Sequence, residues 1–305
     1  MNENISAKKI NVEGMELLGK GQAGEVYADG DKVIKLYFYP KTPMERAYYY
    51  YAISQHFMKE NLPVAKSYDF VEADGRFGII YERIKGEILP DYFKGGFDEK
   101  KKCAAYMGKL MRQLHMANAM DTLFPFEDGP VMGALRMVRV IPEENLQDLI
   151  DNIKALPGPR VMVHGDAHEG NFMMRNDGPV MIDLDTVTIG HPIFDISYWL
   201  FLKEGTPSET RRNRIGITEE QVEEYLYTAY ENYFETTDRT IIDKYIEVMN
   251  YAHDFYMVLD GFKRFKFKED KSGVVEYANE SYPKALEALK KLSEHVEEID
   301  FSFIR

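Results

Sequence analysis

A group of polar side chains in the middle of the chain is suited to holding a metal ion beside a reacting hydroxyl. Two short apolar segments, residues 161–163 and 180–182, flank a loop with His164, Asp166, His168 and Asn171, and Asp183 follows directly. Such segments predict buried strands, so the polar groups are expected at one edge of an apolar hairpin. Phosphoryl transfer depends mainly on positioning and charge neutralisation, and Mg²⁺ prefers oxygen ligands. We therefore predict that Asp166 accepts or orients the proton of an attacking hydroxyl, while Asn171 and Asp183 hold Mg²⁺.

A simpler interpretation applies to the same residues. Asp and Asn commonly cap turns, and histidines near carboxylates often only complete a hydrogen-bond network. A lone Asp and Asn at this spacing would favour that interpretation, but the whole pattern between two apolar segments favours chemistry. His164 and His168 are interpreted as residues that orient the loop, because the pair has no evident third zinc ligand and no helix to present it.

The loop from His164 to Asn171, H-G-D-A-H-E-G-N, resembles the H-G-D-x-H-x-G-N loop of the aminoglycoside phosphotransferase and choline kinase superfamily, relatives of the protein kinases. The resemblance implies that Asp166 is the catalytic residue and that Asn171 and Asp183 bind metal. It also implies that Asp195 braces the loop through its backbone. Ala167 and the pair Leu184-Asp185 depart from the residues common in that family, and the role of Asp185, near the metal or the substrate, stays open.

A glycine-rich segment near the start of the chain predicts a phosphate-binding loop. Gly19, Gly21 and Gly24 form a G-x-G-x-x-G pattern, which dinucleotide-binding folds and kinases share. A dinucleotide-binding loop runs into a helix, whereas here residues 25–28 and 31–37 read as two strands joined by a turn at Asp29-Gly30. That order is typical of kinases.

The register of this hairpin predicts the place of Lys35. With Asp29-Gly30 as the turn, Val26 pairs with Val33 and Gly24 pairs with Lys35, all on one face of the sheet. We expect the two valines to cover an adenine while Lys35 reaches the phosphates. The alternative is that Lys35 is simply an exposed lysine on a strand.

A helix over residues 42–61 follows, with Thr42 as its predicted N-cap and Pro43 at its first position. In kinases a helix at this point supplies a glutamate that pairs with the lysine, and Glu45 is the candidate here. Thr42 and Glu45 also fit a capping box, in which the glutamate binds a backbone N–H group. The sequence leaves both roles of Glu45 open.

Two further strands, residues 64–72 and 77–84, complete the first lobe, and Lys85-Gly86 marks the predicted boundary. The family resemblance places the backbone of Glu82 to Ile84 at the adenine edge. We predict an α+β fold, bilobal and protein-kinase-like. Residues 1–84 form a nucleotide-binding lobe with a mostly antiparallel sheet, and residues 85–305 form a helical catalytic and substrate-binding lobe.

The second lobe carries five segments of helical periodicity, at residues 97–118, 143–156, 218–234, 240–267 and 282–299. Several aromatic residues there fit either a hydrophobic core or a cage for a quaternary ammonium group, and the core is the favoured interpretation. They are Trp199, Tyr251, Phe255, Tyr256 and Phe262. Asp254, Asp260 and His253 are weaker candidates for contacts with substrate amines or hydroxyls.

Composition limits the partners and the location. The formal net charge of −13 opposes binding to a nucleic-acid backbone, and it favours a cationic substrate only as much as it favours solubility. No segment approaches the ~18 apolar residues of a membrane helix, and residues 1–6 lack the pattern of a signal peptide. The single cysteine, Cys103, suits a reducing compartment, so we expect a cytoplasmic protein. The sequence does not indicate an oligomeric state.

We therefore predict Mg-ATP-dependent phosphorylation of a small-molecule hydroxyl. The acceptor stays open among aminoglycosides, choline or ethanolamine, sugars and amino alcohols, and so does the choice between ATP and GTP. A protein kinase is disfavoured, because the short segment between Asp183 and Asp195 contains no A-P-E motif. An ATP-binding pseudoenzyme or scaffold is the alternative from another class, although Lys35, Asp166, Asn171 and Asp183 are all present.

Overall fold

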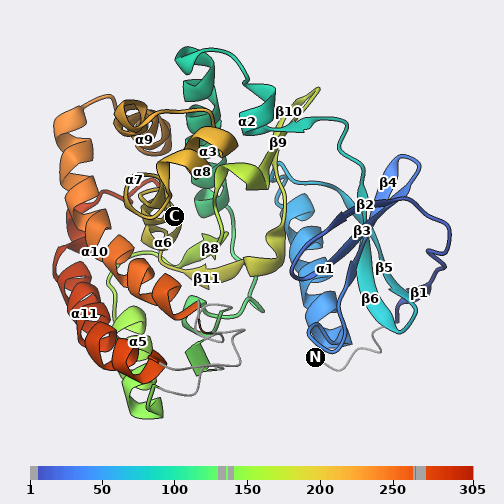
Figure 1. The fold of residues 1–305 in the computed structure, drawn as a ribbon, viewed down its shortest axis with the longest axis horizontal. Helices are drawn as coiled ribbons and strands as arrows, with labels where there is room; N and C mark the ends of the chain where they lie inside the picture. The colour runs from blue at the N-terminus through green and yellow to red at the C-terminus, as the bar shows by residue number, and fades with distance from the viewer. Residues whose placement is uncertain (1–5, 130–134, 137–140, 264, 266–272, 305) are drawn as a thin grey trace. The chain divides into compact units, whose positions relative to one another are not determined.

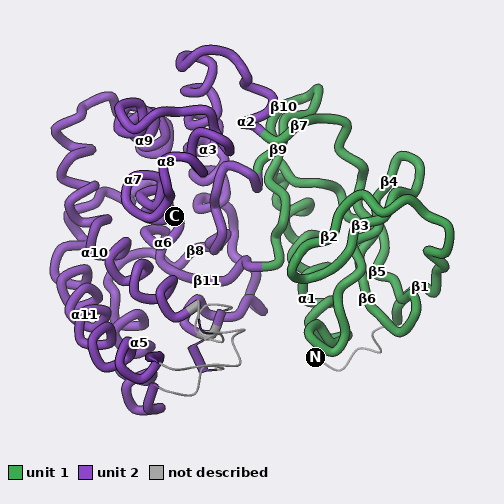
Figure 2. The backbone as a smooth tube through the Cα atoms, in the orientation of Figure 1, with its two compact units in different colours: residues 1–88, 172–185 green, residues 89–171, 186–305 purple. Residues whose placement is uncertain are grey.

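The chain folds into two compact units, which the tube in Figure 2 distinguishes by colour. The computed structural model describes residues 6–129, 135–136, 141–263, 265 and 273–304. The first unit comprises residues 1–88 together with 172–185, and the second comprises residues 89–171 and 186–305. The predicted lobes have a boundary after residue 84 and leave residues 172–185 in the C-terminal lobe. The first unit is thus built from two separate stretches of sequence.

A six-stranded sheet forms the centre of the first unit, in the order β1-β5-β6-β4-β3-β2. Its neighbouring strands are antiparallel except for the pair β1–β5. The strands are β1 (Lys8–Lys9), β2 (Leu17–Lys20), β3 (Gly24–Asp29), β4 (Lys32–Tyr37), β5 (Ser67–Ala73) and β6 (Arg76–Glu82). The glycine-rich segment lies between β2 and β3, and β4 is central, so Lys35 is held by strands on both sides.

The β3–β4 hairpin has a different register from the predicted one. Asp29 pairs with Lys32, so Gly30 and Asp31 form the turn, and Val26 pairs with Lys35 rather than with Val33. Gly30 has a φ of +62°, which suits glycine at the first position of a two-residue hairpin turn. The prediction of Asp29-Gly30 as the turn was wrong. The slip moves the pairing by two residues, so Val26, Val33 and Lys35 still share one face.

Helix α1 (Met44–Lys59) covers one face of this sheet. Ala47 of the helix packs against Tyr37, Phe70 and Ile79, while a second cluster that includes Ile34 and Leu36 fills the other face. The N-cap of α1 is Pro43 and no side chain caps it, so the predicted N-cap at Thr42 was wrong. Thr42 is buried, and its N–H group donates to Phe38 O at 2.8 Å.

A three-stranded sheet, β10-β9-β7, completes the first unit. It is formed by β7 (Glu87–Ile88) with the hairpin β9 (Phe172–Arg175) and β10 (Gly178–Met181). Gly86 is required here, because a Cβ atom at this position would lie 1.9 Å from Met174 O. Arg175 Nη1 donates to Glu82 Oε1 at 2.7 Å, and Val64 bridges to Met181. The hairpin that leads to Asp183 is therefore anchored to the strands that precede it by almost a hundred residues.

The second unit is mainly helical. The predicted helix 97–118 is α3 (Phe97–Met116), 143–156 is α5 (Glu143–Lys154), 218–234 is α9 (Glu219–Phe234) and 240–267 is α10 (Arg239–Lys263). Residues 264 and 266–267 of the last prediction lie outside the described part. A short sheet of β8 (Val161–Val163) with β11 (Thr188–Gly190) carries the catalytic loop. The remaining elements are α2 (Leu89–Tyr92), η1 (Phe126–Asp128), η2 (Glu169–Asn171), η3 (Leu184–Thr186), α6 (Ile193–Tyr198), α7 (Phe201–Glu204), α8 (Ser208–Arg214), α11 (Val274–His295) and η4 (Val296–Glu298).

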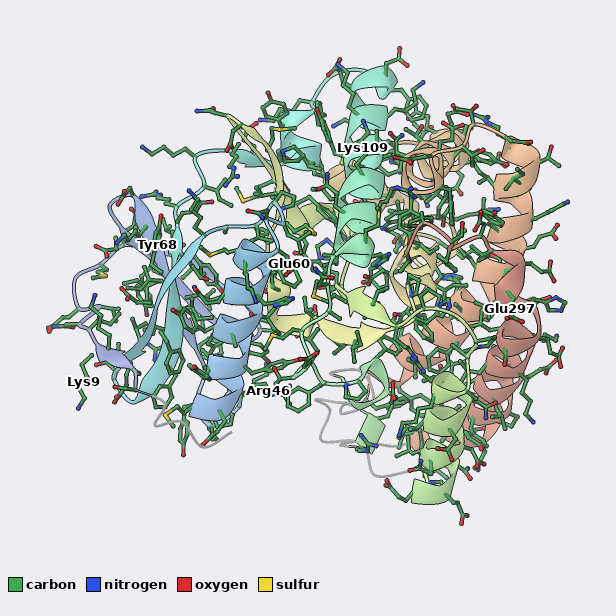
Figure 3. All side chains as sticks on the ribbon, turned by 180° about the vertical axis from the view of Figure 1, so that it is seen from behind. Lys9, Arg46, Glu60, Tyr68, Lys109 and Glu297 are labelled. Atoms are coloured by element: carbon green, nitrogen blue, oxygen red, sulfur yellow. The ribbon has the colours of Figure 1, made fainter. Side chains whose placement is uncertain are left out.

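Helix packing accounts for the buried face of α3. A Cβ atom on Gly108 would lie 2.2 Å from Ala229 O of α9, so the two helices meet closely at a glycine. The exposed Lys109, one residue further on, is labelled in the view from behind (Figure 3). Trp199, Phe255, Tyr256 and Phe262 are buried and Tyr251 is half-buried, which confirms the core interpretation for the four buried aromatics.

Helix α11 begins at Val274, eight residues before the predicted start at Tyr282. Pro283 lies inside the helix, where proline removes a backbone hydrogen bond. The helix follows Gly273, which has a φ of +75°. Within the described ranges, no helix combines the length and the apolar character needed to cross a membrane.

Candidate active site

The loop from His164 to Asn171 in the second unit is fixed by a buried carboxylate at the start of α6. Asp195 Oδ2 accepts the N–H group of His164 at 2.6 Å, and Oδ1 accepts that of Gly165 at 2.8 Å. Gly165 has a φ of +76°, and a Cβ atom there would lie 2.7 Å from Thr186 O. Thr186 Oγ1 donates to His164 O at 2.8 Å. The predicted role of Asp195 as a backbone brace agrees with this geometry.

Asp195 has a third neighbour from α3. His115 Nε2 lies 3.1 Å from Asp195 Oδ2, and His115 Nδ1 lies 2.6 Å from the Tyr233 hydroxyl. All three side chains are buried. Burial, followed by the Asp195 charge, raises the pKa of Tyr233 well above its usual value, so its hydroxyl stays protonated and donates to Nδ1. His115 Nε2 then carries the proton that faces Asp195.

Asp166 itself is held by neutral donors. The Tyr198 hydroxyl donates to Asp166 Oδ1 at 3.3 Å, and Asn171 Nδ2 donates to Oδ2 at 3.3 Å and to Asp166 O at 2.8 Å. Burial and the nearby Asp166 carboxylate raise the pKa of Tyr198, so the hydroxyl stays a donor. The Asp166 side chain is 37% exposed. This carboxylate is therefore oriented from two sides and still open to a reactant.

His168 and Glu169 lie beside this carboxylate and belong to a polar cluster with Arg214. His168 Nδ1 accepts the Gly170 N–H group at 3.0 Å, so its Nε2 carries the ring proton, 3.8 Å from Asp166 Oδ2. Arg214 Nη2 lies 2.6 Å from the buried Glu169 Oε1. His164 is fully buried. The position of both histidines agrees with an orienting role.

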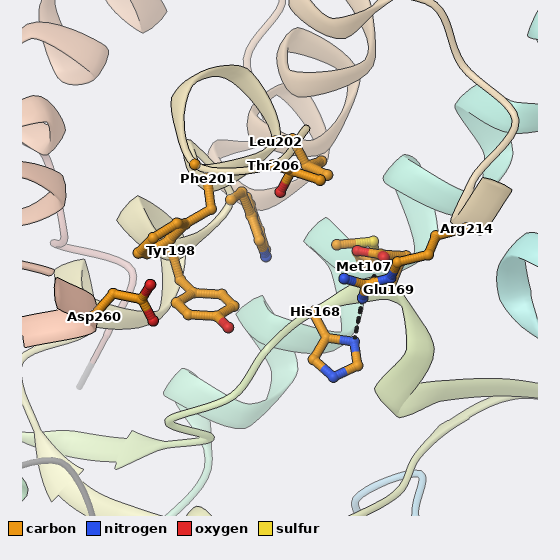
Figure 4. A pocket seen from close by; sticks show the side chains of 11 residues that line it. Met107, His168, Glu169, Tyr198, Phe201, Leu202, Thr206, Arg214 and Asp260 are labelled. Carbon is orange, nitrogen blue, oxygen red and sulfur yellow. Dashed lines mark hydrogen bonds and ion pairs between the residues drawn. The ribbon is translucent and has the colours of Figure 1, made fainter. Parts of the chain in front are cut away.

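A cavity of about 170 Å³ adjoins Asp166 through Tyr198 and His168 (Figure 4). Figure 4 shows Asp260 beside Tyr198, across the cavity from Arg214. The lining also includes Glu169, Phe201 and Thr206. Asp260 was one of the weaker sequence candidates, whereas Asp254 and His253 do not line this cavity. It therefore combines aromatic surface with carboxylates and one guanidinium group.

Tyr198 and Arg214 were not predicted from the sequence. Tyr198 lies three residues after Asp195 on α6, a spacing that places both side chains on one side of a helix. That spacing is a usable signal once Asp195 is recognised as the brace. Arg214 ends α8, a helix that was not predicted, and no sequence signal connects it with Glu169.

The first unit carries a separate charged cluster around Lys35. Lys35 Nζ lies 2.7 Å from Asp183 Oδ1 and 2.6 Å from Asp185 Oδ2, and the Tyr37 hydroxyl donates to Asp185 Oδ1 at 2.8 Å. Burial alone would lower the pKa of Lys35, but the carboxylates of Asp185 and Asp183 outweigh it and raise that pKa. Lys35 is thus a half-buried, charged ammonium group at neutral pH, not an exposed strand lysine.

Glu45 does not contribute to this cluster. It is exposed in the first turn of α1, and the recorded carboxylate partners of Lys35 are Asp183 and Asp185. The expectation that Glu45 pairs with Lys35 is therefore not met in this structure. The alternative role of Glu45 in a capping box is not met either, because no side chain caps α1. Helix α1 starts at Met44, so Glu45 is its second residue, and this is one reason why Glu45 does not form a capping box.

The glycine-rich segment keeps open space at two of its three glycines. A Cβ atom on Gly19 would meet nothing within 4 Å and one on Gly21 only Gly24 O at 4.0 Å, whereas one on Gly24 would lie 2.2 Å from Leu36 O. Close packing therefore explains why position 24 needs a glycine, but it does not explain the glycines at positions 19 and 21. Val26 and Val33 are half-buried on the Lys35 face.

The predicted hinge lies just after β6. The N–H group of Glu82 donates to Lys66 O at 2.8 Å, and that of Arg83 donates to Asp31 O at 2.9 Å. Both amides are therefore used inside the first unit. The third predicted hinge residue is Ile84, and its N–H group donates to no backbone carbonyl within the described ranges.

The donor set predicted for the metal consists of oxygen atoms from two units. Asn171 uses its Nδ2 toward Asp166, which leaves its amide oxygen for other contacts, and the Asp183 side chain is 49% exposed. An amide and a carboxylate oxygen fit a hard cation such as Mg²⁺. No cluster of three or more His, Cys, Asp or Glu residues placed to hold a metal ion occurs in the described ranges.

Comparison with known proteins gives matches to a family and to solved structures. The model of the family described as "Phosphotransferase enzyme family" matches residues 15–233. The curated proteins contain no match to this sequence.

The similar structures include a choline/ethanolamine kinase family protein from Mesorhizobium loti, with 14% identity over 93% of this chain and 91% of the other, and a TM-score of 0.56. They also include the aminoglycoside phosphotransferase APH(2'')-Ib, with 15% identity, coverage of 90% and 94%, and a TM-score of 0.60. Plasmodium vivax ethanolamine kinase has 16% identity, coverage of 93% and 83%, and a TM-score of 0.56. The predicted α+β, protein-kinase-like fold is confirmed by these likenesses.

Proposed function

Because this chain belongs to the phosphotransferase enzyme family, we propose that it transfers the terminal phosphoryl group of Mg-ATP to a hydroxyl of a small molecule. The observation that carries the proposal is Asp166. Its carboxylate is braced through the backbone by Asp195, oriented by Tyr198 and Asn171, and adjoins a cavity of small-molecule size.

Asp166 is assigned as the catalytic residue. A carboxylate within hydrogen-bond reach of a substrate hydroxyl accepts or orients its proton as the oxygen attacks phosphorus. Oδ1 and Oδ2 each have a neutral donor, so the negative charge is not neutralised by a bound cation. This leaves the carboxylate able to act on a hydroxyl brought into the adjoining cavity.

The first unit is assigned to the nucleotide. Gly19 and Gly21 leave open space for phosphates, Gly24 closes the segment against β4, and Lys35 supplies positive charge on the same sheet face as Val26 and Val33. The Ile84 N–H group is the proposed donor to the base edge. APH(2'')-Ib was solved with ADP, and an amicoumacin kinase of similar fold was solved with AMP-PNP and Ca²⁺, which supports an adenine nucleotide.

Asn171 and Asp183 are assigned to Mg²⁺. When bound, Mg²⁺ neutralises charge on the transferred phosphoryl group. The residues of the chain provide oxygen ligands for it, and the hydrogen bond from Asn171 Nδ2 to Asp166 O fixes which amide atom is available.

The acceptor is assigned to the cavity beside Tyr198. The carboxylate of Asp260 favours an acceptor with an amine, since that of Glu169 is paired with Arg214, and Phe201 offers an apolar surface. The named relatives act on or bind ethanolamine, choline and aminoglycosides, all of which carry amine or ammonium groups.

The buried Cys103 thiol, whose pKa burial raises to about 12, fits a protein kept in the reducing cytoplasm.

The test is ADP release with Mg-ATP across a panel of hydroxyl compounds. The panel contains aminoglycosides, choline, ethanolamine, sugars and homoserine, with GTP as an alternative donor and Asp166→Asn as the inactive control. Stimulation by one class in the wild type but not in the variant would establish the reaction and its acceptor. Binding of Mg-ATP without stimulation by any member would favour an ATP-binding pseudoenzyme, and no binding of either nucleotide would overturn the proposal.

A further inference from the structure

Helix α1 does not offer an acidic side chain to Lys35. Glu45 is the one acidic residue in α1, and it is exposed in the first turn. The side of α1 that faces β4 instead carries Tyr50, whose ring centroid lies 5.2 Å from that of Tyr37. The carboxylate that positions the lysine must therefore come from elsewhere in the chain.

Two carboxylates contact Lys35, and they differ in how firmly they are held. The Asp183 side chain is 49% exposed, whereas that of Asp185 is 12% exposed. Asp185 uses both oxygens, one for Lys35 and one for the Tyr37 hydroxyl. Tyr37 is fully buried on β4, two residues after Lys35, so the lysine and the tyrosine point to the same face of the strand.

We propose that Asp185, oriented by Tyr37, is the positioning residue that holds Lys35 toward the nucleotide phosphates. Asp185 is then the less exposed partner of the Lys35 charge, and Asp183 keeps its proposed role toward the metal. The lysine is thereby tied to the segment after β10 and not to α1. This inference rests on the proposed function, since it takes Lys35 as the phosphate-binding residue.

The experiment is a double-mutant cycle on nucleotide binding. The dissociation constant of AMP-PNP with Mg²⁺ is measured by calorimetry for the full-length wild type, Asp185→Asn, Lys35→Met and the double variant. Loss of an orienting partner typically weakens binding or activity by about 10–100-fold, and we expect Asp185→Asn to do so. In the Lys35→Met background the same substitution should change the constant less than about twofold, because Asp185 acts through Lys35.

Two further variants separate positioning from folding. Asp69→Asn is the matched control, because Asp69 forms an exposed pair with Lys8 in the same unit and should bind AMP-PNP like the wild type. Tyr37→Phe removes one hydroxyl only, and it should weaken binding about three- to tenfold in the wild-type background alone. Melting temperatures show whether Asp185→Asn is folded. If that variant is not folded, binding by Tyr37→Phe is used to test the inference instead.

The outcomes distinguish this inference from the proposed function. If Glu45→Gln binds AMP-PNP weakly and Asp185→Asn binds it like the wild type, the inference is overturned, and Glu45 of α1 is the residue that positions Lys35. Equal losses from Asp185→Asn with and without Lys35 would also overturn it, because the effect would then be structural. A wild type that does not bind AMP-PNP, or a Lys35→Met variant that binds it normally, would instead contradict the assignment of the first unit to the nucleotide.

Discussion

The two compact units hold their carboxylates in opposite ways. In the first unit, Asp185 is 12% exposed and forms a salt bridge with the charged Lys35. In the second unit, Asp166 accepts hydrogen bonds from two neutral groups, Tyr198 and Asn171, and the buried Asp195 accepts backbone N–H groups of the same loop. A salt bridge holds two charges in fixed positions, whereas neutral donors orient a carboxylate and leave its charge available.

This difference matches the chemistry proposed for each half. Phosphates need a cation of fixed position, and a reacting hydroxyl needs a carboxylate that can still accept a proton. Asp166 should therefore be sensitive to loss of its charge, and its surroundings should be sensitive to loss of neutral hydrogen bonds. Four substitutions in the second unit test this contrast.

The largest effect is expected from Asp166→Asn. The amide keeps the shape of the side chain but cannot accept a proton, so kcat for acceptor phosphorylation should fall by about 10²–10⁴-fold. Binding of Mg-AMP-PNP and the melting temperature should stay close to those of the wild type, because Asp166 is partly exposed and its hydrogen-bond donors, Tyr198 and Asn171, are neutral. Turnover equal to the wild type would remove Asp166 from the mechanism.

Asp195→Ala should act mainly on stability. Two buried N–H groups, of His164 and Gly165, would lose their acceptors, so we expect a loss of about 2–4 kcal/mol in the free energy of unfolding. Urea denaturation measures it, and Asp98→Ala, at an exposed position of α3, is the control. If both variants unfold alike, the brace does not stabilise the loop.

The pH dependence of stability should reveal a buried neutral histidine next to α6. His191 is fully buried, and its Nδ1 accepts the Ile193 N–H group at 3.2 Å. Burial, followed by Arg160, lowers its pKa to about 3. Below pH 6.5 the unfolded chain binds a proton that the folded chain does not, so stability falls as the pH falls. Its contribution at pH 5 should be about 2 kcal/mol less favourable than at pH 7.

Urea denaturation at both pH values tests the histidine. His191→Gln should remove this part of the pH dependence, while His295→Gln, at an exposed histidine, should keep it. An unchanged pH dependence in His191→Gln would show that His191 titrates normally in the folded chain. Lys35 itself should add nothing in this range, because the neighbouring carboxylates raise its pKa and its charge is retained across the range.

The smallest effect is expected from Tyr198→Phe. Loss of one neutral hydrogen bond to Asp166 should lower kcat by about three- to tenfold, since such a bond contributes about 1 kcal/mol. The matched control is Tyr230→Phe, another buried tyrosine, whose hydroxyl donates to Ile196 O. Both variants should lose similar stability, but only Tyr198→Phe should lose kcat. Equal kcat values would mean that Tyr198 does not orient Asp166.

The sequence predicted the second-unit loop better than the first-unit cluster. The loop is a local feature, because eight consecutive residues and a following Asp define it, and its brace lies close behind in the chain. The fold class also followed from local patterns of strands and helices. The Lys35 cluster depends on residues almost 150 positions apart, and no local rule pairs Lys35 with Asp185.

Three errors share this cause. The turn at Gly30-Asp31 replaced Asp29-Gly30 because pairing with β6 on the other side of β4 also fixes the register. Thr42 is buried and does not cap α1, although its sequence context favours a cap. The predicted start of α11 at Tyr282 was too late, because packing of this helix against α5 and α10 overrides the penalty of a proline in its interior.

The division of the first unit into two stretches has a consequence for how the protein is made. Residues 172–185 complete that unit, so a ribosome that has released residues 1–88 has released an unfinished nucleotide-binding unit whose lysine lacks Asp183 and Asp185. The intervening stretch of the second unit must be synthesised first. A truncated gene product ending at residue 88 would therefore leave the Lys35 ammonium group without these two counterions. Expressing the two units of this enzyme separately requires a circular rearrangement of the gene, because a single cut cannot separate them.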